Sequence, residues 1–255
     1  MRIERLYRYP VKGLSAEALE EAYVEPGGAL PWDRAFALAQ GDAGFDPAVP
    51  SFLPKSNFMC LLRNARIARL AAGFDSHDRK LSITAPDGSK IVETPLTQAG
   101  RERIGAFLVQ YLGEEARHGE AGGPRFHYVP GHVFGDQRQP AISLIGLASL
   151  ATFERDVGSA REWQRFRANI YFSGAPPWAE FDWVEQTVQV GGATLRVTKR
   201  IRRCDATQVN PATGLRDADP VRELMRLYGH PDLGIHTEVV EAGRIAVGDT
   251  ITVLP

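Results

Sequence analysis

The sequence contains few cysteines, and this limits the metal centres that the chain itself can build. Its 255 residues include only two, Cys60 and Cys204. A structural zinc site or an iron–sulfur cluster made from cysteines alone requires about four such ligands, so both kinds of centre are excluded. A disulfide between the two thiols is not expected in a reducing compartment.

The chain also lacks a strong net charge and a long hydrophobic run. Its formal net charge is -1, which gives no global footprint for nucleic acid or for an anionic membrane, so we expect neither as a partner. The most hydrophobic window, residues 141–153, is interrupted by Ser143, Gly146 and Ser149 and is too short to span a bilayer. Without an apolar signal core near its first residues, the protein is predicted to be cytoplasmic.

Common nucleotide and hydrolase motifs are missing too, as are internal repeats. The sequence has no GxGxxG, P-loop, GxSxG or HExxH motif. Its length suits one large or two small domains, and a hydrophobic content of 44% is that of a folded globule.

The first half is predicted to be rich in strands. Alternating apolar residues mark strands near 22–24 and 36–38, and two strands at 81–84 and 91–92 flank a Pro-Asp-Gly turn. Thr97 is a candidate cap for a helix that Gly113 would end. Residues 113–135 are predicted to form a loop; their histidines, His118, His127 and His132, lack the spacing of a zinc site.

The second half is predicted to combine short helices with a small, strongly curved sheet. Ser143 is expected to cap one helix, and Asp219 with Pro220 to begin another, with Val221, Leu224, Met225 and Tyr228 facing inward. Strands are expected at residues 187–190, 194–198, 238–240, 244–247 and 250–253. The pattern indicates an α+β fold in which a strand-rich first half and a second half with a closed or strongly curved sheet are joined by the helix that Gly113 would end.

Cys204 is the strongest candidate for chemistry. It follows a strand-like segment and precedes an Asn-Pro-Ala-Thr-Gly turn, and basic residues stand just before it: Lys199, Arg200, Arg202 and Arg203. Nearby cations favour the thiolate, the form that attacks electrophiles and binds soft metals. The alternative is an inert, partly buried cysteine beside a solvated basic run.

Three further segments contain polar residues or a thiol. A Pro-rich loop, residues 45–58, carries Lys55, which we interpret as a plain surface lysine. Cys60 lies in an apolar run and is predicted to be dispensable. The segment Arg165-Phe166-Arg167-Ala168-Asn169-Ile170 could grip a phosphate or a heteroaromatic edge, or could be a solvent-facing structural cluster.

Taken in order, several short motifs resemble the MOSC domain proteins, a family named for the C-terminal domain of molybdenum cofactor sulfurase. The resemblance rests on residues 9–13 (YPVKG), 32–36 (WDRAF), 142–145 (ISLI), 165–170 (RFRANI), 178–183 (WAEFDW), 203–204 (RC) and 209–214 (VNPATG). It implies an N-terminal β-barrel domain, residues 1–112 with the joining helix, followed by the MOSC domain, residues 113–255. This arrangement is similar to that of the mitochondrial amidoxime-reducing component and its bacterial relatives.

The resemblance implies a pterin-type molybdenum cofactor, with Cys204 as the protein's sulfur ligand to the metal. Lys12 and Arg34 would contact the phosphate or pterin end, Arg167 and Asn169 the pterin, and Arg203 the cofactor beside the cysteine. A thiolate is a soft ligand and therefore suits this metal. The implied activity is reduction of small N-hydroxylated or N-oxygenated compounds, with electrons from a separate ferredoxin-like or flavin protein.

Three positions depart from the family pattern. Gly13 stands where many relatives have serine, Arg202 where some have serine, and Asn210 where aspartate is usual.

Two rival functions stay open. One is a sulfur carrier that bears a persulfide on Cys204 for metal–sulfur cofactor assembly. The other is a non-catalytic module that binds an anion through residues 199–203.

Overall fold

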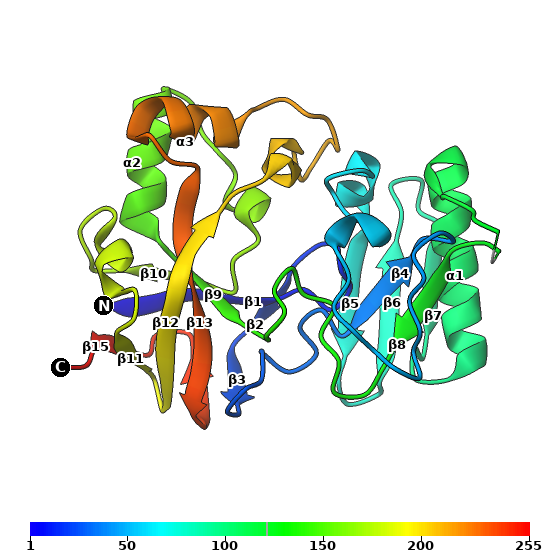
Figure 1. Ribbon diagram of the computed structural model, residues 1–255, viewed down its shortest axis with the longest axis horizontal. Coiled ribbons are helices and arrows are strands. Elements are labelled where there is room, and N and C mark those ends of the chain that lie inside the picture. The colour runs from blue at the N-terminus through cyan, green and yellow to red at the C-terminus, as the bar shows by residue number, and fades with distance from the viewer. Residues whose placement is uncertain (121) are drawn as a thin grey trace.

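The computed structural model describes residues 1–120 and 122–255, which form two lobes side by side (Figure 1). The larger lobe contains the longest sheet and two helices, and the smaller lobe contains short sheets and one helix. Both chain ends lie on the larger lobe, where Met1 and Ile251 exchange backbone hydrogen bonds of 2.8 and 3.2 Å. The α+β, strand-dominated fold predicted from the sequence is confirmed.

The larger lobe is organised around a curved sheet with the order β15-β11-β12-β13-β9-β10-β1-β2. Its strands are β1 (Arg2–Arg8), β2 (Glu17–Leu19), β9 (Ile142–Gly146), β10 (Ile170–Ser173), β11 (Thr187–Val190), β12 (Ala193–Arg202), β13 (Asp232–Glu241) and β15 (Ile251–Val253). Helices α2 (Leu147–Val157) and α3 (Pro220–Tyr228) pack beside it. Within the described residues, β9 and β10 are the parallel pair of this sheet.

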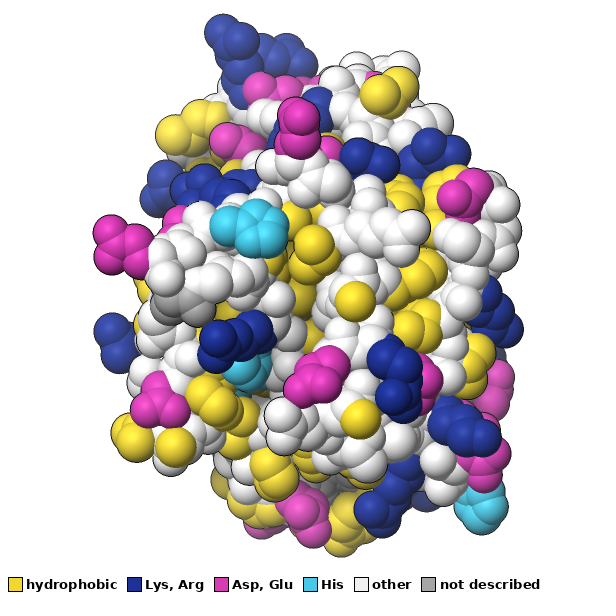
Figure 2. Space-filling view, turned by 90° about the vertical axis from the view of Figure 1, so that its right-hand side faces the viewer, with side chains coloured by type: hydrophobic (Ala, Val, Ile, Leu, Met, Phe, Trp, Pro, Cys, Tyr) yellow, Lys and Arg dark blue, Asp and Glu magenta, His cyan; other side chains and the backbone are white. Residues whose placement is uncertain are grey.

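The smaller lobe is built from elements between residues 36 and 128. Strands β5 (Ala71–Asp75), β6 (Lys80–Thr84) and β7 (Lys90–Glu93) form one sheet, and β4 (Phe36–Ala39) pairs with β8 (Arg125–Tyr128). Helix α1 (Gln98–Leu112) contacts β7 and β8. Figure 2 shows the end of this lobe, where hydrophobic side chains line a shallow hollow.

The first strands of the chain tie the two halves together. β1 pairs with β10 and β2, and β3 (Glu21–Val24) pairs with β14 (Gly243–Ala246). Ile3 and Leu6 on β1 are buried in the core of the larger lobe. The predicted division after residue 112 stays a prediction, and the pairing shows that residues 2–24 share sheets with the second half.

Six short 3₁₀ helices connect these elements in the described part of the chain. They are η1 (Lys55–Asn57), η2 (Ala65–Arg69), η3 (Gly113–Glu115), η4 (Trp163–Phe166), η5 (Ala179–Trp183) and η6 (Asp205–Gln208). Three of them, η1, η4 and η6, hold side chains at the candidate site.

The prediction that Ser143 caps a helix was wrong. Residues 142–146 form β9, and all five are buried because β9 lies between β13 and β10. A continuous apolar run of this length fits a strand buried on both faces as well as it fits a helix. The helix begins later, at Leu147, with Gly146 as its N-cap.

The loop predicted for residues 113–135 was wrong in part, because residues 125–128 form β8. The predicted starts of two helices are confirmed. Thr97 caps α1 by accepting the Gly100 N–H, and Asp219 caps α3, which has Pro220 at its start. Met225 does not face inward, since it is 52% exposed. Among the described residues, no helix is long and apolar enough to cross a membrane.

Candidate functional site

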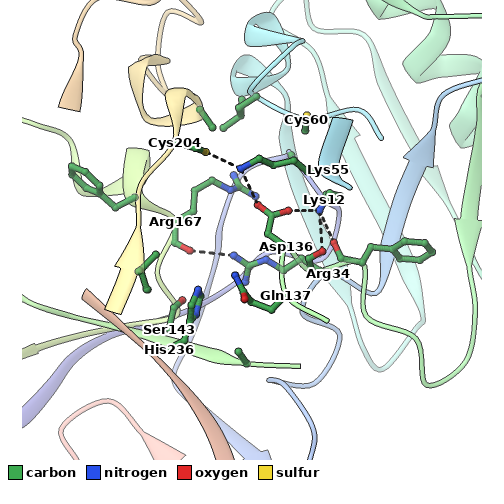
Figure 3. Close-up of a pocket in the computed structure, with 18 of the residues that line it drawn as sticks. Lys12, Arg34, Lys55, Cys60, Asp136, Gln137, Ser143, Arg167, Cys204 and His236 are labelled. Carbon is green, nitrogen blue, oxygen red and sulfur yellow. Dashed lines mark hydrogen bonds and ion pairs between the residues drawn. The ribbon is translucent and has the colours of Figure 1, made fainter. Parts of the chain in front are cut away.

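A cavity of about 180 Å³ lies where the two lobes meet, and it collects the candidate residues from both halves of the sequence. Figure 3 shows them converging from segments that are far apart in the chain. The polar residues and cysteines that line it include Lys12, Arg34, Lys55, Cys60, Asp136, Gln137, Ser143, Arg165, Arg167, Asn169, Arg202, Arg203, Cys204 and His236. The cavity thus combines a thiol with many cations.

Cys204 sits at the end of β12, where it is the N-cap residue of η6. Its thiol is a free one and is only partly buried. Lys55 Nζ lies 2.9 Å from Cys204 Sγ (Figure 3). The cation in contact with the sulfur therefore comes from the Pro-rich loop, and Lys55 is not the plain surface lysine that we predicted.

Lys12 is buried, and acceptors surround its ammonium group. It donates to the carbonyl oxygens of Phe134 at 2.9 Å and Gly135 at 3.3 Å, and to Asp136 Oδ1 at 2.5 Å. Asp136 Oδ2 lies 3.9 Å from Lys55 Nζ. An ammonium has three N–H groups, so an anionic ligand that binds Lys12 must displace one of these partners. Asp136 is the exchangeable one, because its side chain is 53% exposed.

The charge on Asp136 is stabilised by its neighbours. Burial works to raise the pKa of this carboxyl, but Lys12, Lys55 and Arg34 outweigh it and lower the pKa to about 2. Asp136 is therefore ionised at neutral pH, and it occupies the position in which the cations would meet an external anion.

Arg34 and Arg167 both stack on one aromatic ring. Their guanidinium carbons lie 4.5 and 4.3 Å from the centroid of the Tyr9 ring. Arg34 donates to Asp33 Oδ2 at 2.5 Å and to the Arg167 carbonyl at 3.2 Å, and Arg167 donates to the Leu14 carbonyl at 2.6 Å. Both arginines have left-handed backbones, with φ of 49° and 52°. Such strain outside glycine is tolerated where the surroundings impose it, often at ligand sites.

Arg203 and Asn169 shape the wall of the cavity. Arg203 is buried and donates to the carbonyl oxygens of Leu233 and Phe166, which joins the end of β12 to β13 and η4. Burial lowers its pKa to about 10, so it stays charged at neutral pH. Asn169 accepts from the Ser143 N–H and hydroxyl at 3.1 and 2.8 Å and donates to the Tyr7 carbonyl at 3.1 Å.

The structure therefore brings all six predicted site residues to one cavity. Cys204 and the cations of Lys12, Arg34 and Arg167 lie at its surface, whereas the polar atoms of Arg203 and Asn169 are occupied by protein partners. Their roles toward a cofactor stay predictions.

His236 is a lining residue that the sequence did not reveal, because nothing in its strand segment distinguishes it. Its Nδ1 is buried and has no hydrogen-bond partner among the described residues. Burial, helped by Arg203 and Lys199, lowers its pKa to about 3, so the imidazole is neutral. An unpaired buried nitrogen beside a cavity is costly, and a ligand with a polar ring edge would supply the partner.

The residues fit a cofactor that brings most of its own metal ligands. In the described part of the chain, no group of three or more His, Cys, Asp or Glu side chains could hold a metal ion. One soft thiolate beside several cations and an unpaired imidazole nitrogen suits an anionic, heteroaromatic metal cofactor.

A second cavity, of about 680 Å³, lies beside α1 on the smaller lobe. Its lining includes Arg101, His118 and His127, but no thiol among the described residues. It is the larger of the two, but the predicted site residues line the cavity between the lobes.

Asn210, one of the departures from the family pattern, has a structural reason. Its Nδ2 donates to Asp217 Oδ2 at 2.7 Å and to Glu162 Oε1 at 3.3 Å, and both of these carboxylates also bind Arg165. Its Oδ1 accepts from the Thr213 N–H at 3.1 Å. An aspartate here could keep the turn but would face two carboxylates, so the amide suits this chain.

Gly13 is required by its backbone and by its neighbours. Its φ is +87°, and a Cβ there would lie 2.8 Å from Ile67 Cδ1 and 3.1 Å from the Met59 carbonyl oxygen. We expect Gly13→Ser to lower the free energy of unfolding by about 3 kcal/mol, from backbone strain plus overpacking. Gly27→Ser is the matched control, because Gly27 has φ +71° but nothing within 4 Å; it should cost about 1 kcal/mol. Equal losses in urea unfolding would contradict the packing argument.

The stability of the protein should fall in acid, in part through His236. Its folded pKa, about 3, lies below the ordinary value of 6.5, so the unfolded chain binds the proton first. The contribution of His236 to the free energy of unfolding is therefore fully present above pH 6.5 and is lost as the pH falls toward 3. Between pH 7.5 and 5, we expect the parent to lose about 1–2 kcal/mol more than His236→Gln does. Equal losses in urea titrations at the two pH values would exclude this contribution.

The fold and the cavity together define a strand-rich protein in which a cavity lined by cations contains the thiol of Cys204. Comparison with protein families makes the assignment specific. The model of the MOSC N-terminal beta barrel domain matches residues 1–121, and that of the MOSC domain matches residues 124–252. The chain belongs to the MOSC domain family.

Solved structures show more distant similarity. The YuaD protein of Bacillus subtilis is 14% identical, with a TM-score of 0.44, over 98% of this chain and 93% of that one. YiiM of Geobacillus stearothermophilus is 16% identical, with a TM-score of 0.34, over 45% of this chain and 54% of that one. A search of curated proteins gives no match. Both TM-scores are low, so the family assignment rests on the two family models.

Proposed function

We propose that this protein binds a pterin-type molybdenum cofactor and reduces small N-hydroxylated or N-oxygenated compounds. The observation that carries the proposal is the cavity between the lobes, where the partly buried thiol of Cys204 meets the cations of Lys12, Arg34 and Arg167. A thiolate can hold a soft metal, and the cations can hold the anionic part of the same cofactor. Membership of the MOSC family supports this choice of cofactor.

Each residue has a proposed task. Cys204 binds the metal, while Lys12 and Arg34 bind the phosphate or pterin end once Asp136 has moved aside. Arg167 and Asn169 border the pterin, and Arg203 holds the backbone beside Cys204 in place. His236 offers its unpaired Nδ1 to a polar ring edge. When bound, the cofactor supplies two-electron chemistry at an N–O bond, and the protein positions and shields it.

The reaction consumes reducing equivalents that this chain does not store. Reduction of an N-hydroxy group takes two electrons and two protons and yields the N–H compound and water. The sequence has two cysteines, too few for an iron–sulfur cluster with cysteine ligands. We therefore propose that a separate ferredoxin-like or flavin protein supplies the electrons. The cytoplasmic location belongs to the same proposal.

The sulfur-carrier alternative is retained because of one contact. Lys55 Nζ, at 2.9 Å from Cys204 Sγ, would also stabilise a persulfide anion. In that case Cys204 would accept sulfur and pass it to a metal–sulfur centre without binding molybdenum.

Reductase activity is tested with protein made in a host that synthesises the cofactor. With chemically reduced methyl viologen as the electron source, we expect steady conversion of an aromatic amidoxime to the amidine. NADH alone should give no turnover until a reductase and a carrier protein are added. If fully molybdenum-loaded protein gave no viologen-driven reaction, the reductase proposal would be contradicted. Turnover with NADH alone would contradict the need for a carrier.

A further inference from the structure

The basic residues just before Cys204, at positions 199–203, have contacts other than the Cys204 thiol, so a role toward that thiol does not explain them. Arg203 is buried and bonded to backbone carbonyls, and Arg200 stacks on Phe181, with its guanidinium carbon 4.4 Å from the ring centroid. Lys199 and Arg202 are exposed. Within the described chain, the cation that contacts the Cys204 thiol is Lys55.

Lys199 and Arg202 lie instead at the rim of the cavity. Arg202 is one of the residues that line it. Lys199 Nζ donates to Gln137 Oε1 at 2.6 Å, and Gln137 also lines the cavity. These contacts place two exposed cations from β12 beside the mouth.

A third exposed cation comes from the loop that contains Gln137. Arg138 follows Gln137, and its guanidinium carbon lies 5.4 Å from the centroid of the Phe52 ring in the Pro-rich loop. The same loop carries Lys55, which is 29% exposed. Two loops and the end of β12 thus contribute positive charge to one rim.

Negative charge near this rim is only partly neutralised. Asp136 is paired with Lys12 at 2.5 Å, and Asp33 with Arg34 at 2.5 Å. Asp205, next to Cys204, is exposed, and Asp232 on β13 lies opposite Arg202, so these two carboxylates offset part of the positive charge. The positive charge at this rim is a local feature, because the whole chain has a formal net charge of -1.

We propose that Arg138, Lys199 and Arg202 form a docking surface for an acidic, ferredoxin-like electron carrier protein. We call these three residues the basic rim. The inference rests on the proposed function for the choice of an electron carrier, and on charge complementarity for its acidic surface. Docking there places the carrier over the cavity that contains Cys204. Rim charges of this kind act mainly by steering association, so their effect depends on ionic strength.

The test measures binding, which does not require the metal. The probe is an acidic plant-type [2Fe–2S] ferredoxin, titrated into the cofactor-free chain at 50 and 300 mM salt. We expect the Kd of the parent to rise at least tenfold with salt. The variant Arg138→Glu, Lys199→Glu, Arg202→Glu should bind at least tenfold more weakly at low salt and should lose most of the salt dependence.

The matched control reverses three charges elsewhere. Lys80 on β6 and Arg222 and Arg226 on α3 are exposed and lie outside the cavity lining. Their replacement by glutamate changes the net charge by the same amount and should change the Kd by less than twofold. With loaded protein, the double variant Arg138→Glu, Lys199→Glu, which leaves every residue that lines the cavity in place, should keep its viologen-driven rate and lose ferredoxin-driven rate.

Several results would overturn the proposal. They are equal weakening in the control variant, unchanged binding in the basic-rim variant, no ferredoxin binding, and tighter binding of a basic carrier such as cytochrome c or of anionic lipid vesicles. Failure of the proposed function is distinguishable. If protein purified from a cofactor-producing host contained no molybdenum but still bound ferredoxin through the basic rim, the cofactor proposal would be contradicted and the docking surface would stand. A loaded chain that does not bind ferredoxin would contradict only the docking surface.

Discussion

Cys204→Ser should abolish reductase activity while leaving the fold intact. The side chain is only partly buried, and a serine hydroxyl can accept the hydrogen bond from Lys55, so the free energy of unfolding should stay within about 1 kcal/mol of the parent. An alkoxide is a harder and far more basic ligand than a thiolate, so bound molybdenum should fall or its redox poise should change. Serine cannot form a persulfide either.

Cys60→Ser is the matched control, because Cys60 borders the same cavity. Burial raises the pKa of the Cys60 thiol, so it stays protonated and apolar in character. We expect full activity and full molybdenum content, with about 1–2 kcal/mol lost in stability from a buried hydroxyl.

The measurement is paired: bound molybdenum and amidoxime reduction for both variants. Full activity in Cys204→Ser would contradict the molybdenum and the sulfur-carrier proposals together. Lost activity with unchanged molybdenum would mean that the pterin contacts retain the cofactor and that the thiolate only tunes the metal.

Arg167→Met should weaken retention of the cofactor by about tenfold or more. A charge-assisted contact to an anion contributes about 1.5–3 kcal/mol, and Arg167 stays charged at neutral pH although burial lowers its pKa to about 10. The close approach of Arg34 also lowers the pKa of Arg167, so an anionic ligand would relieve their repulsion. Molybdenum remaining after timed dialysis measures the retention.

Arg200→Met is the control for losing a stacked arginine. Arg200 also lies over an aromatic ring, that of Phe181, but it is not among the residues that line the cavity. Retention should equal that of the parent. If Arg167→Met lost cofactor no faster than Arg200→Met, Arg167 would have no role in binding it.

The fold was predictable where local signals were strong. Thr97 with Gly113, and Asp219 with Pro220, mark α1 and α3 because capping and proline geometry act over a few residues. β9 was not predictable, because an apolar run buried on both faces shows no strand periodicity. The pairing of β1 with β10 joins segments about 165 residues apart, and no local pattern specifies such a partner.

The candidate site was predictable only through short motifs considered together. Cys204, Lys12, Arg34 and Arg167 stand in motifs that resemble the family pattern, and they reach one cavity. The contact between Lys55 and Cys204 spans 149 positions, and Asp136 gains its role from Lys12, 124 positions away. Such contacts depend on how the lobes meet, so the sequence suggested the wrong cations for the thiol.

The central claim is that this cavity holds a molybdenum cofactor through Cys204. The most direct test is elemental analysis of protein purified from a cofactor-producing host, with a host unable to make the cofactor as the control. We predict about one molybdenum per chain from the first host, none from the second, and a large loss in Cys204→Ser. Protein from the producing host that lacks molybdenum but carries a persulfide on Cys204 would contradict the claim and support the sulfur carrier.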